Sequence, residues 1–319
     1  MRVDYLPEGI FLPAIDLWLD PRVPVPSAWL SHAHSDHARG LHQTVIATGI
    51  TAQIYRHRWP LPVDRTQRTI HVNPGQSIEW NGATLTVRQA AHILGAAQLV
   101  VDHQGERLIY TGDIKRRSPI CGWLTESTLC DHLIIESTFG LPIYQFLEAA
   151  DAQARIAGFA RECLASGLTP VFQGYGLGRG QEIAHTLALH RIPCKIHHSI
   201  AGLIPYYEAQ GYVFPTESDG GAILVTPGLE EKLPIPPAKR KSALVSGWAA
   251  LDNARARANA DVLIPYSDHA DFSELLALVA DANPTQIDIV HGYAEPFARI
   301  LRERGHNARA AHVASEAQI

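Results

Sequence analysis

Ten residues in the first part of the chain, Ser31 to Gly40, read Ser-His-Ala-His-Ser-Asp-His-Ala-Arg-Gly, with three histidines and one aspartate in the order His-x-His-x-Asp-His. The Ala-Trp-Leu run just before them is typical of the end of a buried strand. Side chains two positions apart on an extended chain point the same way, so His32 and His34 can bind one metal ion. A turn after them would bring Asp36 and His37 to a second ion, because imidazole and carboxylate groups both bind zinc and related metals.

The composition is that of an ordinary globular protein, since 319 residues with 46% hydrophobic and 18% charged residues can form one large domain or two smaller ones. A formal net charge of −5 gives no overall basic field of the kind that favours nucleic-acid binding, although bound divalent metals would add positive charge. The cysteines form no Cys-x-x-Cys pair, so we expect four buried thiols in a reducing compartment. Neither a signal peptide nor a membrane-length apolar run is visible, so we expect a cytoplasmic protein that does not enter a membrane.

Strand-like runs dominate the first 140 residues. Asn81-Gly82 between two β-rich runs is typical of a hairpin turn, because both residues readily adopt the positive φ angles that such a turn needs. A second hairpin is expected across residues 103–106. The strands expected in this part are two short ones within 9–20, and then 44–47, 76–80, 83–88, 98–102 and 107–111.

The pattern changes after residue 140, where a long helix is expected from Leu147 to Ser166. Shorter strands and helices alternate after it, at 169–173, 181–190, 194–198, 204–210 and 243–246. The β-rich pattern then returns, with strands at 262–266, 287–290 and 308–313, a helix capped by Asp271 and Glu274, and a helix at 296–304. We therefore predict a discontinuous domain of residues 1–144 and 261–319 with an α/β insertion of residues 145–260.

Three more ligand-type residues follow predicted strands. His92 comes after the first hairpin, Asp113 ends the run Tyr-Thr-Gly-Asp, and His291 follows Ile-Val. Each alone is a weak signal, because single histidines are often structural and single aspartates often belong to turns. Together with the first block they form a strong set of metal-ligating residue types.

This set, in this order, resembles the metallo-β-lactamase superfamily over nearly the whole chain. The resemblance implies an αββα sandwich with two divalent metal ions at one edge of its sheets; zinc and manganese are the expected metals, and iron also suits such ligands. One ion would take His32, His34 and His92, the other would take Asp36, His37 and His291, and Asp113 would bridge them. Asp20 matches the first, mainly structural, aspartate of the family.

Two further stretches resemble the β-CASP branch of this superfamily. The run from Glu136 to Gly140 is similar to the acidic motif that opens the β-CASP insertion, and Ser267-Asp268-His269 is similar to the histidine motif that follows it. The branch consists of nucleases that act on DNA or RNA. The overall pattern is most similar to the bacterial ligase-associated DNA exonucleases, relatives of Artemis. The resemblance therefore implies DNA as the substrate, a role in DNA repair, and a DNA ligase and a helicase as partners.

The resemblance also suggests catalytic and substrate-binding residues. His269 is the expected acid for the leaving oxygen, Glu136 would orient it and favour its protonated form, and Asp36 belongs to the same catalytic group. The basic run Lys239–Lys241 suits phosphate contacts and a solvated surface equally well. The glycine-rich stretch Gly174–Gly180 precedes a helix and has backbone amides that suit a phosphate, but a plain loop is favoured there. The residues expected to contact substrate are Lys115, Arg116, Ser137, Thr138, Arg179 and Ser267.

Three other functions stay open at this point. A β-CASP ribonuclease that processes RNA ends is favoured by His291, because RNA-processing members keep a histidine in the last motif that Artemis-type enzymes typically lack. The lack of an appended RNA-binding segment after that motif argues against it. A small-molecule ester, thioester or lactam hydrolase would not need the insertion. A scaffold protein that has lost its metals is disfavoured, because all seven ligand positions are intact.

Overall fold

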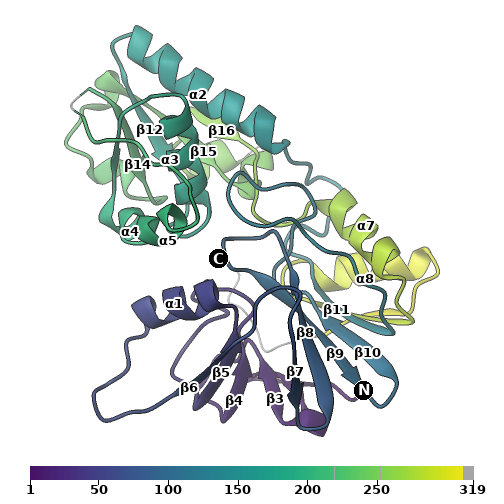
Figure 1. The fold of residues 1–319 in the computed structure, drawn as a ribbon. Helices are drawn as coiled ribbons and strands as arrows, with labels where there is room; N and C mark the ends of the chain where they lie inside the picture. Colours follow the sequence, from purple (N-terminus) through teal and green to yellow (C-terminus); the bar gives the residue numbers. More distant parts are fainter. Residues whose placement is uncertain (219, 252, 312–319) are drawn as a thin grey trace. The chain divides into compact units, whose positions relative to one another are not determined.

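The structure is a computed structural model that describes residues 1–218, 220–251 and 253–311 (Figure 1). The chain forms two compact units, which we describe separately. The sandwich unit contains residues 1–116, 123–142 and 269–311, and the inserted unit contains residues 117–122 and 143–268. The domain boundaries at residues 145 and 260 stay a prediction, but strand β16 (Val262–Ile264) pairs with Ala243–Val245 of the inserted unit.

The sandwich unit contains two β-sheets that pack face to face. The first has the strand order β1 (Asp4–Leu6), β2 (Gly9–Leu12), β3 (Leu17–Leu19), β4 (Ser27–Trp29), β5 (Thr44–Ala47) and β6 (Arg68–His71). The second has the order β18 (Ala308–Ala310), β17 (Gln286–Val290), β11 (His132–Glu136), β10 (Glu106–Tyr110), β9 (Ala97–His103), β8 (Ala83–Gln89) and β7 (Ser77–Trp80). Leu12 and Trp29 of the first sheet share one buried core with Leu85 and Leu99 of the second.

Helices cover the outer faces of both sheets, which completes the four layers of an αββα sandwich. Ala52 and Tyr55 of helix α1 (Gly49–Arg58) pack on Ala28 of the first sheet (Figure 1). In β10 and β11, alternate residues face the core between the sheets, and the residues between them face the other way, toward α7 (Phe272–Ala282). Helix α8 (Ala294–Glu303) packs on β17 and β18 of the same sheet. The predicted fold class is confirmed for this unit.

Local sequence signals account for much of this unit. The hairpin at Asn81-Gly82 is confirmed, because Trp80 pairs with Ala83 across the turn. The capping box of α7 is confirmed as well: Asp271 accepts a hydrogen bond from the amide of Glu274 at 3.0 Å, and the Glu274 carboxylate accepts one from the amide of Asp271 at 3.0 Å. The predicted strand at 308–313 is observed over 308–310, and its last two positions lie outside the described residues.

Helix α1 and strands β1 and β6 were not predicted. The buried face of α1 includes Thr51, so it lacks a purely apolar pattern. The hydroxyls of Thr48 and Thr51 donate to the carbonyl oxygen of Gly95 at 2.7 and 2.9 Å, which makes their burial favourable. A buried polar pair of this kind hides an amphipathic helix from a search for apolar periodicity.

The inserted unit has one parallel sheet flanked by helices, as the α/β prediction requires. The strand order is β13 (Cys194–Ile196), β14 (Ala222–Val225), β12 (Thr169–Gln173), β15 (Arg240–Val245) and β16. Ile156 of α2 (Ala149–Ala165) and Leu187 of α3 (Arg179–Leu189) pack on Phe172 of the central strand. The other short helices of this unit are α4 (His198–Ala201), α5 (Ile204–Glu208) and α6 (Ala254–Arg257).

Two expectations about the whole chain can be compared with the structure. The four cysteines, Cys121, Cys130, Cys163 and Cys194, are all buried free thiols, as expected. Among the described helices, none has the length and apolar character needed to cross a bilayer.

Candidate metal centre

The predicted metal ligands come from both sheets of the sandwich unit. His32 and His34 follow β4 of the first sheet, whereas His92 and Asp113 follow β8 and β10 of the second. His291 follows β17, which runs parallel to β11 and so ends at the same edge as Glu136. Strand ends thus place residues that are far apart in sequence at one edge of the sandwich.

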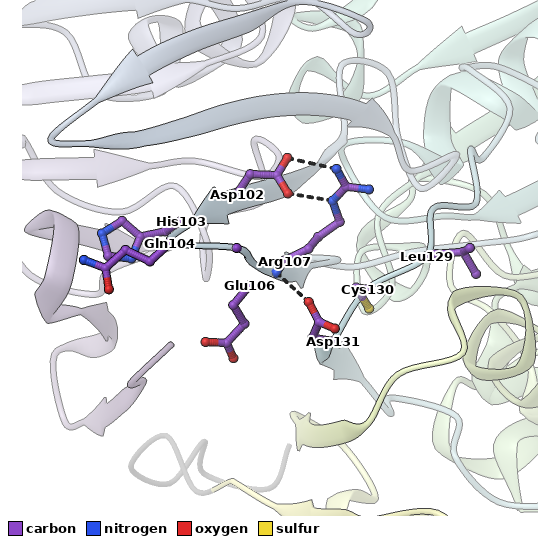
Figure 2. Close-up of a pocket in the computed structure, with 9 residues that line it drawn as sticks. Asp102, His103, Gln104, Glu106, Arg107, Leu129, Cys130 and Asp131 are labelled. Atoms are coloured by element: carbon purple, nitrogen blue, oxygen red, sulfur yellow. Dashed lines mark hydrogen bonds and ion pairs between the residues drawn. The ribbon is translucent and has the colours of Figure 1, made fainter.

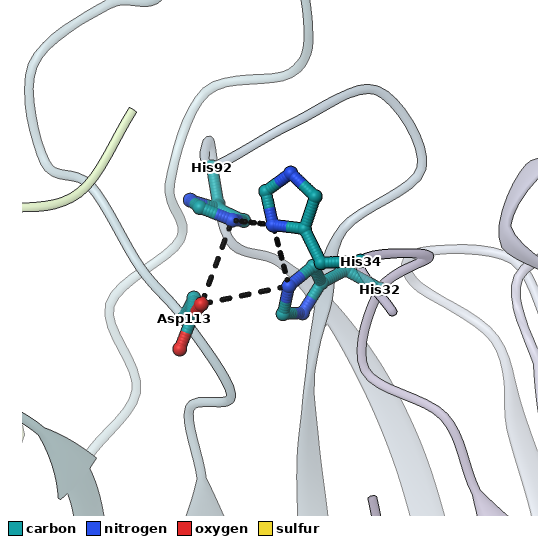
Figure 3. A group of neighbouring side chains, drawn as sticks. All are labelled: His32, His34, His92 and Asp113. Atoms are coloured by element: carbon teal, nitrogen blue, oxygen red, sulfur yellow. Dashed lines mark hydrogen bonds and ion pairs between the residues drawn. The ribbon is translucent and has the colours of Figure 1, made fainter. Parts of the chain in front are cut away.

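Four of these residues converge most closely (Figure 3). The Nδ1 atom of His34 lies 3.1 Å from Nε2 of His32 and 3.0 Å from Nε2 of His92. Asp113 Oδ2 lies 3.5 Å from the Nε2 atom of His32 and 3.6 Å from that of His92. The four ligand atoms all lie within 4.8 Å of one another, and three of the residues are buried. Three imidazole nitrogens and a carboxylate oxygen form a donor set that suits zinc or a similar divalent ion.

Asp20 orients two histidines of this centre. Its carboxylate accepts hydrogen bonds from the Ser31 amide at 2.7 Å, from the Ser31 hydroxyl and from the Tyr110 hydroxyl at 2.8 Å. It also lies 2.8 Å from Nδ1 of His37, which leaves Nε2 facing Asp113 at 3.4 Å. The Ser31 hydroxyl in turn contacts Nδ1 of His32 at 3.0 Å, so the Nε2 atom of that ring points into the cluster. Partners of this kind fix the tautomer and direction of metal-binding histidines.

The second predicted set is more open than the first. Asp36 Oδ2 lies 3.8 Å from Nε2 of His37, and the Asp36 side chain is 64% exposed. The His291 ring centroid lies 5.2 Å from that of His37. The backbone of His291 has a positive φ of 58°, and its carbonyl oxygen accepts a hydrogen bond from the Ser137 hydroxyl at 2.6 Å. The structure therefore brings all three residues to the same edge but does not draw them into a tight cluster.

Burial and neighbouring charges both shift the pKa values of the buried ligands. Burial, with the surrounding histidines, holds the pKa of His32 well below its usual value. Burial also disfavours charge on His37, but Asp113, Asp36 and Asp20 outweigh it and raise the pKa of His37. Burial raises the pKa of Asp113 to about 6. A neutral His32 imidazole is the form that binds a metal, because coordination uses an unprotonated nitrogen.

Glu136 and His269 form a dyad beside these ligands. Nδ1 of His269 lies 2.9 and 3.0 Å from the two carboxylate oxygens of Glu136 and 3.9 Å from Asp113 Oδ2. The Glu136 carboxylate also accepts hydrogen bonds from the amides of Ile114 at 2.8 Å and Thr138 at 3.2 Å. Burial alone would raise the pKa of Glu136, but His269 and these amides outweigh it and lower the pKa to about 2. An ionised Glu136 can thus hold the His269 ring in place and stabilise its protonated form.

The residues expected to contact substrate in the sandwich unit are mostly engaged with the protein. The Lys115 side chain is only 2% exposed, and Arg116 forms an ion pair with Asp281 at 3.1 Å. Ser137 is buried against the His291 backbone, and the Thr138 amide is held by Glu136. Lys115 and Ser137 are therefore buried, whereas half of the Arg116 side chain is exposed, and the assignment of these residues as phosphate contacts stays a prediction.

The expected substrate residues of the inserted unit are buried there as well. The Arg179 side chain is 1% exposed, forms ion pairs with Glu182 and with Asp268 at 3.5 Å, and lies over the Tyr266 ring at 4.2 Å. Ser267 is also 1% exposed. In the glycine-rich stretch, the Gly178 amide donates to the Gln181 side chain at 2.8 Å, and the Gly180 amide donates to the Tyr175 carbonyl at 2.9 Å. Both amides are therefore hydrogen-bonded to groups of the same segment, as expected for a plain loop. Lys239 and Lys241 are exposed.

The sequence reasoning missed three residues that shape the centre: Ser31, Tyr110 and Gly112. Gly112 has a φ of 55°, and a Cβ atom at this position would lie 2.5 Å from the Ser31 side chain. The available signal was their position inside motifs that had already been recognised. Without the fold, however, nothing in the sequence indicated that Tyr110 and Ser31 both reach Asp20.

A surface pocket of the sandwich unit lies at a different set of residues (Figure 2). It is lined by the turn between β9 and β10 and by residues 129–131. Arg107 makes two hydrogen bonds to the Asp102 carboxylate at 2.7 and 3.1 Å, and its amide donates to Asp131 at 2.8 Å. These charged groups are paired with one another, and the pocket includes none of the predicted ligands.

Comparisons with known proteins agree with this geometry. The family model described as "Zn-dependent metallo-hydrolase RNA specificity domain" matches residues 256–311. A protein of Opitutus terrae named "Probable DNA ligase" is 34% identical over 315 residues, which cover 94% of this chain and 30% of that protein. The chain belongs to the β-CASP branch of the metallo-β-lactamase superfamily. It is thereby a member of a metal-dependent hydrolase family, as the sequence predicted.

Other matches to this β-CASP protein cover smaller parts or show the fold alone. "Cleavage and polyadenylation specificity factor subunit 3" of Dictyostelium discoideum is 31% identical over 154 residues, which cover 46% of this chain and 19% of that protein. A solved structure titled "Crystal Structure of a Protein of Unknown Function from Enterococcus faecalis V583" has a TM-score of 0.57 at 15% identity, over 83% of this chain and 75% of that one. The chain thus spans less than a third of the length of either named relative.

Proposed function

We propose that the protein is a metal-dependent DNA exonuclease that hydrolyses phosphodiester bonds with two divalent ions. The observation that carries this proposal is the convergence of His32, His34, His92 and Asp113 beside the Glu136–His269 dyad. His32, His34 and His92 would hold one ion together with Asp113. Asp36, His37 and His291 would hold the other, again with Asp113. Zinc and manganese both suit this donor set.

The centre would supply what phosphodiester hydrolysis requires. Divalent ions bound there would neutralise the charge of the phosphodiester and activate the attacking water. His269 would then donate a proton to the leaving oxygen. Its Nδ1 atom is held by Glu136, so the transferred proton is the one on Nε2, and the negative Glu136 favours the protonated ring before transfer.

DNA is favoured as the substrate because the Opitutus terrae relative aligns over 94% of this chain and is named a probable DNA ligase. This supports an enzyme that works with a DNA ligase, and with a helicase, in DNA repair in the cytoplasm. The alternative is a ribonuclease that processes RNA ends. It is favoured by the match of residues 256–311 to a domain described as an RNA specificity domain, and by the histidine at position 291.

The test is a digest of end-labelled single- and double-stranded DNA and RNA by protein reconstituted with zinc or manganese. We expect stepwise shortening of DNA from one end by wild type, and none by Asp113→Asn at unchanged secondary structure. Preference for RNA would replace the proposal with its alternative. Full activity of Asp113→Asn would reject the assigned role of that carboxylate, and wild type that cuts no polynucleotide would reject the nuclease function.

A further inference from the structure

We propose that a surface of five arginines next to the metal loop binds the phosphates of the nucleic-acid strand beyond the bond that is cut. We name it the arginine surface; it consists of Arg39, Arg56, Arg58, Arg65 and Arg68. The inference rests on the proposed nuclease function and deepens it by assigning where the uncut part of the substrate lies.

The sequence around this surface is strongly basic within an acidic chain. Residues 37–78 contain these five arginines, and Asp64 is their sole carboxylate, although the whole chain has a net charge of −5. Arg39, Arg65 and Arg68 are exposed, and Arg56 and Arg58 are half-buried. Local positive charge of this kind attracts a polyanion whatever the net charge of the protein.

Hydrogen bonds through Tyr55 join the three segments that carry the arginines. The Tyr55 hydroxyl donates to the Gly40 carbonyl at 2.6 Å, next to Arg39, and accepts a hydrogen bond from the Gln67 side chain at 3.3 Å, next to Arg68. The Arg56 guanidinium lies 5.9 Å from the Tyr55 ring centroid. The Arg68 amide donates to the Gln43 carbonyl at 2.9 Å. The loop after His37, the end of α1 and the start of β6 therefore lie next to one another.

This surface adjoins the metal loop at two points. The Arg58 guanidinium donates to the carbonyl oxygen of Ala33 at 2.9 Å, and Ala33 lies between His32 and His34. Arg39 follows the buried His37 by two residues. A strand whose phosphate reaches the metal ligands would therefore have its next phosphates within reach of the arginines.

Three of these arginines lack an acidic partner in the described part of the chain. No ion pair is found there for Arg39, Arg65 or Arg68. By contrast, several other arginines of the same unit are neutralised: Arg107 by Asp102 at 2.7 Å, Arg116 by Asp281 at 3.1 Å and Arg302 by Glu295 at 2.7 Å. Arginine is well suited to phosphate because its planar group donates two parallel hydrogen bonds.

The test compares the double variant Arg65→Gln/Arg68→Gln with the control Arg299→Gln/Arg304→Gln, which removes the same charge from exposed positions near the end of α8. The side chains of Arg65 and Arg68 are exposed, and their amides donate to backbone carbonyls that glutamine keeps. For each metal-loaded protein, kcat/KM is measured on a long oligonucleotide and on a dinucleotide over a series of salt concentrations.

We expect the arginine-surface variant to lose roughly 25- to 60-fold in kcat/KM on the long substrate at about 0.1 M salt relative to about 1 M salt, because each phosphate contact adds about 0.7–0.9 to the salt slope. Its salt slope should fall by about 1.4–1.8 for the two lost contacts. The dinucleotide rate and the control variant should match wild type. Equal losses on both substrates, or a loss as large in the control, would overturn the inference alone. Wild type that cleaves neither substrate would remove the proposed function and, with it, this inference.

Discussion

Replacement of Asp20 by asparagine tests how the metal centre is oriented. The carboxylate accepts hydrogen bonds from Ser31, Tyr110 and His37, and it is only 8% exposed. Asparagine keeps the shape but loses the charge and one acceptor oxygen. Hydrogen bonds to charged groups contribute about 1.5–3 kcal/mol each, and a buried donor without a partner costs about 1–3 kcal/mol. We therefore expect Asp20→Asn to lose ~3–5 kcal/mol of unfolding free energy.

The same substitution should weaken metal binding, because His37 would lose the partner that turns its Nε2 atom toward Asp113. Loss of such a partner typically lowers metal affinity by about 10- to 100-fold. The assays are denaturant unfolding of the metal-free protein and a competitive zinc titration. Tyr110→Phe is the matched control: it removes one donor to the same carboxylate, and we expect it to lose about 1.5–3 kcal/mol with unchanged zinc affinity. Asp20→Asn with wild-type stability and wild-type zinc affinity would refute this reasoning.

Three further predictions concern different parts of the sandwich unit. His269→Ala should lower the hydrolysis rate by about 10²–10⁴ while metal content stays unchanged, as measured by elemental analysis; lost metal would mean that His269 is a ligand. Gly112→Ala should lose at least ~2 kcal/mol in a denaturant titration, because its φ of 55° is unfavourable for alanine and the new Cβ would lie 2.5 Å from Ser31. Burial opposes ionisation of Asp288, but Arg309, His132 and Tyr5 outweigh it and hold its pKa well below the ordinary value. Because the pKa of Asp288 is lower in the folded protein than in the unfolded chain, the ionised carboxylate stabilises the fold above the unfolded pKa, and this stabilisation is lost as the pH falls. The free energy of unfolding should therefore decline below about pH 4, and less steeply in Asp288→Asn. Equal acid sensitivity of the two proteins would contradict this assignment.

The sequence was most informative where function requires a fixed order of residue types. The His-x-His-x-Asp-His block, with His92, Asp113 and His291, was sufficient to predict the family and the αββα sandwich. Strands were predicted best where turn chemistry is local, as at Asn81-Gly82. Both kinds of signal depend on residue types at particular positions of the chain, which a single sequence contains in full.

The sequence was less informative where a residue acts through a distant partner. Arg179 has the chemistry of a phosphate ligand, but its ion pairs with Glu182 and Asp268 bury it. Lys115 follows the Asp113 motif directly, yet its side chain is also buried. Side-chain burial depends on tertiary packing, so basic residues next to a motif are poor evidence of substrate contact by themselves.

The net charge of the chain is also a poor guide to substrate binding, because the effect of each charged side chain depends on its partners in the fold. A net charge of −5 counted mildly against a nucleic-acid substrate, but that sum averages over surfaces that have different partners. Arg107, Arg116 and Arg302 are each neutralised by a carboxylate, so they contribute little field at a distance. Arg39, Arg65 and Arg68 have no such partner in the described chain and lie in the segment that follows the metal loop. If the arginine surface binds phosphates as proposed, these arginines supply the local attraction for the substrate, whatever the sign of the total charge.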